Sequence, residues 1–137
     1  MLEQGRPGVI INISSVNAQQ PGEGQVAYCA AKAGVDMITR CGALELGSRG
    51  IRVVGIAPGL VETPLTRQEL EDPSTRALFM AVIPMNRPVA PEEIGEAAVF
   101  LASDNARSIN GHTVVIDAGS LTRGYPALLT GLRVQAV

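Results

Sequence analysis

Three short apolar runs divide the sequence, and glycine or proline flanks each of them. They cover Val9 to Ile13, Ile51 to Ala57 and His112 to Asp117, and they predict three β-strands. The first run is apolar on both faces except at Asn12. A strand of that kind is typical of a parallel sheet that is covered on both sides.

Two helices are predicted between these strands. The longer one runs from near Gln25 to about Leu46, and the glycines that follow it end the helix and turn the chain. The other opens at Pro91, has two acidic residues in its first turn and stops near Ser103. Apolar residues recur at helical spacing in both segments: Val35, Ile38, Cys41 and Leu44 in the first, and Ile94, Ala97, Ala98 and Leu101 in the second.

A long segment, residues 60–91, follows the second strand. Asp72 and Pro73 form a good N-cap and first position for a short helix over Thr75 to Val82. Long excursions at the carboxyl end of a strand are usually lids or substrate loops, with a plain connector as the alternative. The order strand, helix, strand, lid, helix, strand predicts an α/β fold. We expect a Rossmann-like, doubly wound parallel sheet in partial form, with three strands and flanking helices.

Composition narrows the class of protein. The 137 residues are 46% hydrophobic and carry a formal net charge of -2; the isoelectric point is about 5.4 and the mean hydropathy +0.21. These values favour one globular domain and give no electrostatic reason to expect nucleic acid or an anionic membrane as a partner. No apolar run approaches a membrane span, and the first eight residues lack an apolar signal core. We expect a soluble, cytoplasmic protein.

The cysteines and the histidine show no metal-ligand spacing, so no metal site is expected. Cys29 and Cys41 are twelve residues apart, which within one helix separates them by about 18 Å, far beyond disulfide reach. We expect two small, buried, free thiols. His112 has no nearby partner in the sequence.

Candidate chemistry gathers where the first strand ends and the long helix begins. Ser15 follows the strand directly, and the helix carries Tyr28 and Lys32 four residues apart. That spacing places both side chains on one helix face, about 6 Å apart. An ammonium beside a phenol stabilises the phenolate, which favours proton exchange. Lys32 is the only lysine among eleven basic residues, in a sequence that otherwise uses arginine.

Several stretches together resemble the short-chain dehydrogenase/reductase family. NISS…YCAAK, with thirteen residues from Ser15 to Tyr28, resembles the family's catalytic signature. APGLVET, residues 57–63, resembles the turn on its nicotinamide side. RPVAPEEIGEAAVFLASDNARSINGHTVVIDAG resembles its last helix and strand. The resemblance covers residues 7–119.

This resemblance implies an oxidoreductase that interconverts a small-molecule alcohol and carbonyl with NAD or NADP. Tyr28 would be the general acid/base, Lys32 would lower the pKa of the phenol and bind the nicotinamide ribose, and Ser15 would orient the substrate oxygen. Tyr28 and Lys32 would thus also belong to the cofactor site. The residues expected to flank the nicotinamide are Pro58, Gly59, Val61 and Thr63.

The sequence also departs from the family pattern. No G-x-G-x-x-G-like run occurs in it, although the family uses a Gly-rich turn to hold the cofactor pyrophosphate. Residues 1–119 resemble the C-terminal half of the family's domain, with the last three of seven strands, and residues 120–137 form a tail. We therefore expect a fragment, a truncated gene model or one half of a complementing pair, and as partners either further copies or an N-terminal half. The alternative is a non-catalytic fragment or interaction module.

Overall fold

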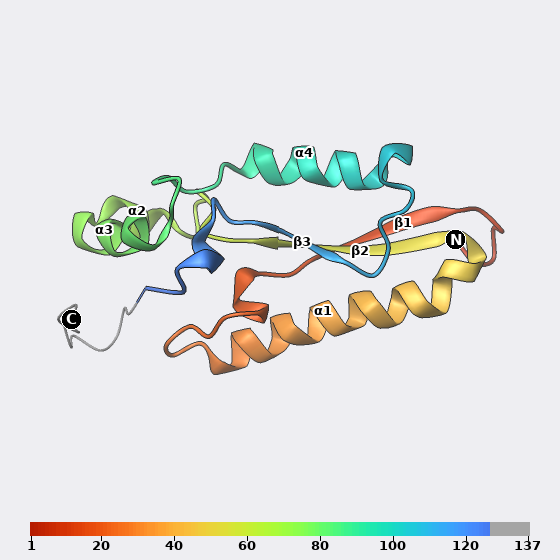
Figure 1. Cartoon of the computed structure of the whole chain (residues 1–137), viewed down its shortest axis with the longest axis horizontal. Helices are drawn as coiled ribbons and strands as arrows, with labels where there is room; N and C mark the ends of the chain where they lie inside the picture. The colour runs from red at the N-terminus through yellow and green to blue at the C-terminus, as the bar shows by residue number, and fades with distance from the viewer. Residues whose placement is uncertain (127–137) are drawn as a thin grey trace.

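A computed structural model describes residues 1–126 and confirms the predicted sheet. β1 (Gly8–Ile13), β2 (Ile51–Pro58) and β3 (Thr113–Ile116) form a parallel sheet in the order β1-β2-β3 (Figure 1). The register pairs Gly8 with Ile51 along the first two strands and Pro58 with Ile116 along the next two. All three strands therefore end at the same edge of the sheet.

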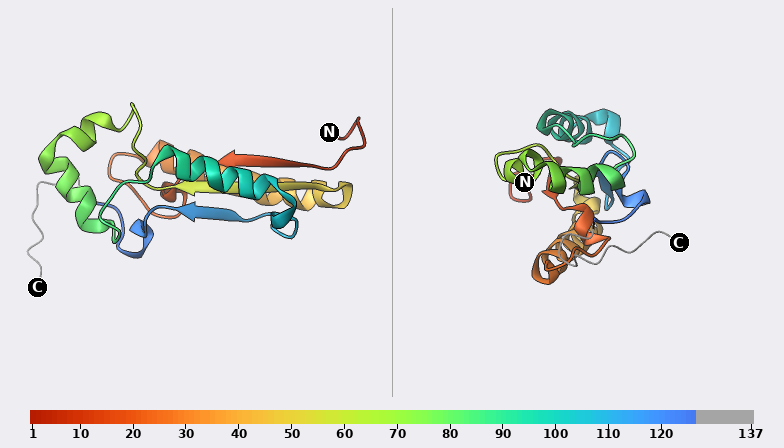
Figure 2. Two further views of the ribbon diagram at one scale, coloured as in Figure 1. Left: turned by 90° about the horizontal axis from the view of Figure 1, so that it is seen from above. Right: turned by 90° about the vertical axis from the view of Figure 1, so that its left-hand side faces the viewer.

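The two predicted helices cover opposite faces of the sheet. α1 (Val26–Leu46) lies along one face and α4 (Pro91–Ala102) along the other (Figure 1). The view down the long axis in Figure 2 shows the sheet between them. A core of fully buried side chains fills the space between the sheet and α4, and it consists of Val54, Ile56, Leu101 and Ala106. This arrangement confirms the doubly wound α/β prediction.

The lid, defined here as residues 60–91, lies beyond the carboxyl ends of the strands (Figure 2). It holds α2 (Arg67–Glu71), which the sequence reasoning missed, and α3 (Pro73–Val82), which it predicted from Thr75 onward. The backbone closes the neck of the lid, because Val89 N–H donates to the Leu60 carbonyl at 2.8 Å and its own carbonyl accepts from Glu62 N–H at 2.9 Å. The lid is thus anchored at both ends.

The N-cap of α3 is the predicted one. The Asp72 carboxylate accepts hydrogen bonds from Ser74 Oγ at 2.6 Å and Thr75 N–H at 2.7 Å. These bonds, led by the one from Ser74, lower the pKa of Asp72 to about 2. Because the folded-state pKa is below the unfolded one, this cap contributes fully at neutral pH and is lost as the pH falls from about 4 toward 2.

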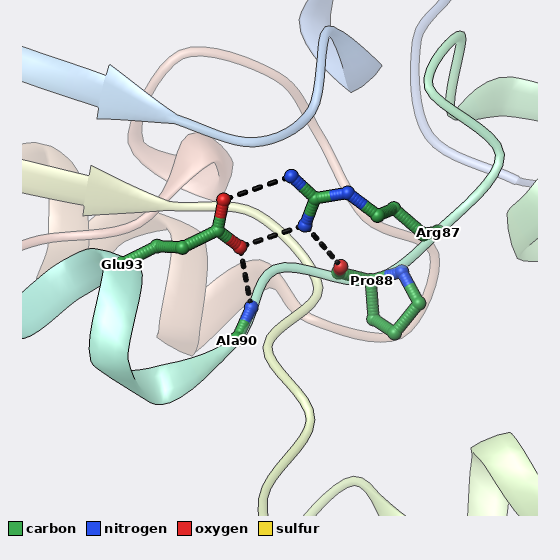
Figure 3. A network of polar contacts seen from close by, with 4 residues as sticks. All are labelled: Arg87, Pro88, Ala90 and Glu93. Carbon is green, nitrogen blue, oxygen red and sulfur yellow. Dashed lines mark hydrogen bonds and ion pairs between the residues drawn. The ribbon is translucent and has the colours of Figure 1, made fainter.

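The return of the lid into α4 is fixed by an ion pair (Figure 3). The Arg87 guanidinium donates to both oxygens of Glu93, at 2.7 and 2.8 Å, and also to the Pro88 carbonyl at 3.1 Å. Glu93 also accepts the Ala90 N–H at 2.8 Å, which satisfies a backbone donor at the start of the helix. The bond from Arg87 is the main cause that lowers the pKa of Glu93 to about 2.

The structure differs from the prediction on the outer side of α1. The buried residues of this helix are Asp36, Thr39 and Ala43, whereas Leu44 is 85% exposed and Val26 is 82% exposed. Asp36 accepts a hydrogen bond from Thr113 in β3, and Thr39 accepts one from Asn12 in β1. Polar groups that pair with the sheet therefore occupy the inner face of α1, and much of the apolar periodicity lies outside.

β1 lies at the edge of the sheet with α1 on one face and α4 on the other, as expected, although Ile10 and Ile13 are exposed. One further expectation of burial is wrong. Cys29 and Cys41 are free thiols on α1, as expected, but Cys41 is exposed and Cys29 only partly buried.

The turn after β3 places a residue with a side chain in an unfavourable backbone conformation. Ala118 has φ +52°, in the left-handed region that costs a residue with a Cβ about 1–2 kcal/mol. The tail is described only as far as residue 126, and its three leucines, Leu128, Leu129 and Leu132, lie outside that range. None of the helices in residues 1–126 has the length and apolar character needed to cross a membrane.

Candidate active site

Lys32 ties the end of β1 to the first turns of α1. Its ammonium donates to the Ile13 carbonyl at 3.0 Å, and its own carbonyl accepts a hydrogen bond from Ser14 Oγ at 3.2 Å. The same ammonium lies 5.6 Å from the centroid of the Tyr28 ring. The predicted pair therefore shares one helix face, and the pair is fixed against the chain that leads into Ser15.

Ser15 is buried at the start of a short 3-10 helix, Val16–Ala18, where it serves as N-cap. Its Oγ accepts the N–H of Asn17 at 3.1 Å. A hydroxyl that accepts in this way keeps its own hydrogen for donation. Ser15 can therefore donate to an oxygen placed beside it.

A cavity of about 310 Å³ brings Ser15 and Tyr28 together at the carboxyl end of the sheet. Gly59, from the turn after β2, lines it as well. The other described lining residues come from the loop between β1 and α1, from the lid with α2 and α3, and from the chain after β3, including residues 124–126. Tyr28 is 46% exposed, so its ring is open to the cavity and solvent. Lys32 is not among the described lining residues and adjoins the site through the Tyr28 ring.

The four residues predicted to flank a nicotinamide are distributed over this region. Of these, Gly59 alone lines the cavity beside Tyr28. Pro58 is the last residue of β2, and Val61 forms an isolated parallel bridge with Val89 at the neck of the lid. Thr63 N–H donates to Thr66 Oγ1 at 3.0 Å, and Thr63 lines a second hollow of about 410 Å³ that lid residues form among themselves.

Gly59 has no room for a side chain. A Cβ at this position would lie 2.7 Å from Cβ and 2.8 Å from Cα of Asp117, and backbone cannot move aside cheaply. Asp117 is itself fixed, because its carboxylate accepts from Gly119 N–H, Ser120 Oγ and Leu121 N–H. The turn that borders the cavity is therefore packed directly against the turn after β3.

We expect Gly59→Ala to lower the free energy of unfolding by about 1–3 kcal/mol, because the new methyl group overpacks this contact. Urea denaturation of the chain measures the effect. Gly95→Ala in α4 is the matched control, since a Cβ there meets nothing within 4 Å and alanine favours a helix. Equal stability of the two variants would contradict the close packing at Gly59.

Sequence reasoning missed a set of polar contacts across the cavity. Asn17 Nδ2 donates to Gln25 Oε1 at 2.6 Å, and Gln25 Nε2 donates to the Tyr125 hydroxyl at 3.1 Å. The Tyr125 ring also meets Phe79 of α3 edge to face, with centroids 6.0 Å apart. Burial raises the pKa of Tyr125. The segment containing Tyr125 carries no sequence pattern, so only the fold could reveal these contacts.

Comparison with known proteins gives consistent matches. A family model described as enoyl-(acyl carrier protein) reductase matches residues 1–120. The 3β-hydroxysteroid dehydrogenase 1 of Eggerthella lenta is 46% identical over 130 residues, which are 95% of this chain and 49% of that protein. The chain spans about half the length of the curated relatives it matches.

Two solved structures show the same fold with a nicotinamide cofactor bound. One, from Agrobacterium tumefaciens and described as a 2-deoxy-D-gluconate 3-dehydrogenase, contains NADP; it is 38% identical, with a TM-score of 0.86 over 89% of this chain and 50% of that one. The other is 4-hydroxyisoleucine dehydrogenase with NADH; it is 31% identical, with a TM-score of 0.86 over 88% of this chain and 49% of that one. Sequence and fold agree, and the chain belongs to the short-chain dehydrogenase/reductase family of oxidoreductases.

Proposed function

We propose that this chain carries the proton-transfer end of an active site that interconverts a small-molecule alcohol and a carbonyl with NAD or NADP. The observation that supports it best is the cavity that joins Tyr28 and Ser15, with the Lys32 ammonium 5.6 Å from the Tyr28 ring. The family supports the reaction class. Its members with bound NADP and bound NADH support a nicotinamide cofactor without deciding between the two.

The three residues have different roles in the proton transfer. Tyr28 donates its phenolic proton to the carbonyl oxygen during reduction and takes the proton back during oxidation. The Lys32 cation stabilises the phenolate left on Tyr28, and Ser15 donates its free hydrogen to the substrate oxygen and so orients it. The proton thus moves between two oxygen atoms, and the ammonium remains charged throughout.

The residues present fit the nicotinamide end of the cofactor. The Tyr28 phenol, with the Lys32 ammonium beside its ring, and Gly59 of the turn after β2 border the same cavity. When bound, the cofactor supplies or accepts the hydride. Tyr28 and Lys32 would hold its ribose, and the segment of Pro58, Gly59, Val61 and Thr63 would hold the ring and carboxamide.

Nicotinamide mononucleotide tests this proposal, because it contains the end of the cofactor that these residues would hold. We expect its addition to shift the backbone amide resonances of Tyr28, Lys32 and Gly59 in two-dimensional NMR spectra. Adenosine monophosphate, the other half of the cofactor, is the matched control and should leave them in place. Equal shifts with both nucleotides, or none with either, would refute the assignment.

A second candidate is a non-catalytic interaction module, and the outer face of α1 favours it. Val26, Met37 and Leu44 are all exposed there, and a second copy of the chain that packed on this face would bury them. Sedimentation of the NMR sample separates the candidates, since a defined oligomer without nucleotide shifts would favour the module.

We also propose a cytoplasmic location, which the two free thiols support.

A further inference from the structure

The wall of the cavity beside Tyr28 carries very little charge. Among the described residues that line it, Glu69 of α2 has the one charged side chain, and it is a carboxylate. A negative group on a ligand would therefore meet repulsion and no cationic partner in this lining. The rest of the wall is largely apolar, with Leu60, Leu65, Phe79, Val82 and Ile83 prominent in it.

The Tyr125 hydroxyl in the wall can serve a ligand as a hydrogen-bond donor. The Tyr125 hydroxyl accepts from Gln25, so its own hydrogen can be donated, and the raised pKa of Tyr125 keeps that hydrogen in place. A ligand hydroxyl can therefore accept a hydrogen bond from Tyr125.

We propose that this cavity takes an uncharged, compact alcohol or ketone with an apolar ring and a second hydroxyl, and that Tyr125 determines the preference for that hydroxyl. The volume of about 310 Å³ corresponds to on the order of ten water molecules in the liquid, which suits a small ring. The inference rests on the proposed function for its reacting end, where Tyr28 and Ser15 meet the first oxygen.

Three ketones of similar size test the proposal by direct binding. They are 4-hydroxycyclohexanone, 4-methylcyclohexanone and 4-oxocyclohexanecarboxylate. The chain has two tyrosines and no tryptophan, so tyrosine emission reports on Tyr28 and Tyr125 in this cavity. We expect the hydroxyl compound to bind about tenfold more tightly than the methyl compound, the gain of about one hydrogen bond. The carboxylate should bind more weakly than either.

Tyr125→Phe keeps the ring that packs on Phe79 and removes only the hydroxyl. We expect it to bring the hydroxyl-to-methyl preference down to about one while affinity for 4-methylcyclohexanone is unchanged. Glu69→Gln should raise affinity for the carboxylate several-fold. Glu71→Gln is its matched control, since Glu71 lies on the same helix but lines the other hollow.

The proposal is overturned if the carboxylate binds as tightly as the hydroxyl compound, or if Tyr125→Phe retains the preference for the hydroxyl. Binding of these ketones is measured without nucleotide. Failure here, with nucleotide shifts at Tyr28 and Lys32 intact, would therefore reject the substrate class alone. Loss of the nucleotide shifts, with the ketone preference intact, would reject the proposed function.

Discussion

Tyr28→Phe is expected to reduce turnover by at least about 100-fold, because general acid/base catalysis by a positioned side chain contributes about 10²–10⁴-fold. The variant keeps the ring beside the Lys32 ammonium and removes the hydroxyl that would protonate the carbonyl oxygen. Ser15 and the cavity wall remain. Turnover is measured with reduced nicotinamide mononucleotide and 4-hydroxycyclohexanone, by loss of the dihydronicotinamide absorbance.

Nucleotide binding separates this loss from a loss of structure. Because Lys32 keeps its bond to Ile13 and can still hold the ribose, the variant should retain most of its affinity for nicotinamide mononucleotide. Glu45→Gln, exposed near the far end of α1, is the control and should leave turnover unchanged. If the Phe variant reduced the ketone at the parent rate, Tyr28 would not be the acid.

The order of elements could be predicted because each one is specified locally. Apolar runs flanked by glycine and proline give the three strands, and Pro91 with its acidic first turn gives α4. The face of α1 that is buried could not be predicted, because Asp36 and Thr39 are buried only by virtue of partners in β3 and β1. Hydrophobic periodicity assigns such residues to the surface and the exposed leucine to the core.

The candidate site likewise has one part that could be predicted from the sequence and one part that could not. Ser15, Tyr28 and Lys32 could be found from the sequence, because a strand end and one helix face suffice to bring them together. The wall opposite could not, since Gln25 and Tyr125 are 100 residues apart and meet only through the folding of the whole chain. Thr63 belongs to the same predicted cofactor segment as Gly59, but it lines the second hollow and not the cavity beside Tyr28.

We expect Lys32→Arg to lower turnover roughly 10- to 100-fold, and the contacts of Lys32 give the reason. An ammonium is a compact point charge on a flexible stem, and here it reaches the Ile13 carbonyl at 3.0 Å while lying 5.6 Å from the Tyr28 ring. A planar guanidinium is larger and has fixed donor directions, so it cannot occupy this position without displacing Tyr28 or the end of β1. Lys32→Arg therefore keeps the positive charge but is expected to lose most of the turnover.

Two measurements distinguish misplacement of Tyr28 from loss of the fold in this variant. Its unfolding in urea should change little, since the helix keeps a long basic side chain at a partly buried position. Its nucleotide-induced shifts at Tyr28 should shrink, because the ammonium proposed to hold the ribose is gone. Arg40→Lys, exposed on the same helix, is the reverse control and should leave both readouts unchanged. Parent-level turnover in Lys32→Arg would show that any cation suffices, and the argument from a compact charge would fail.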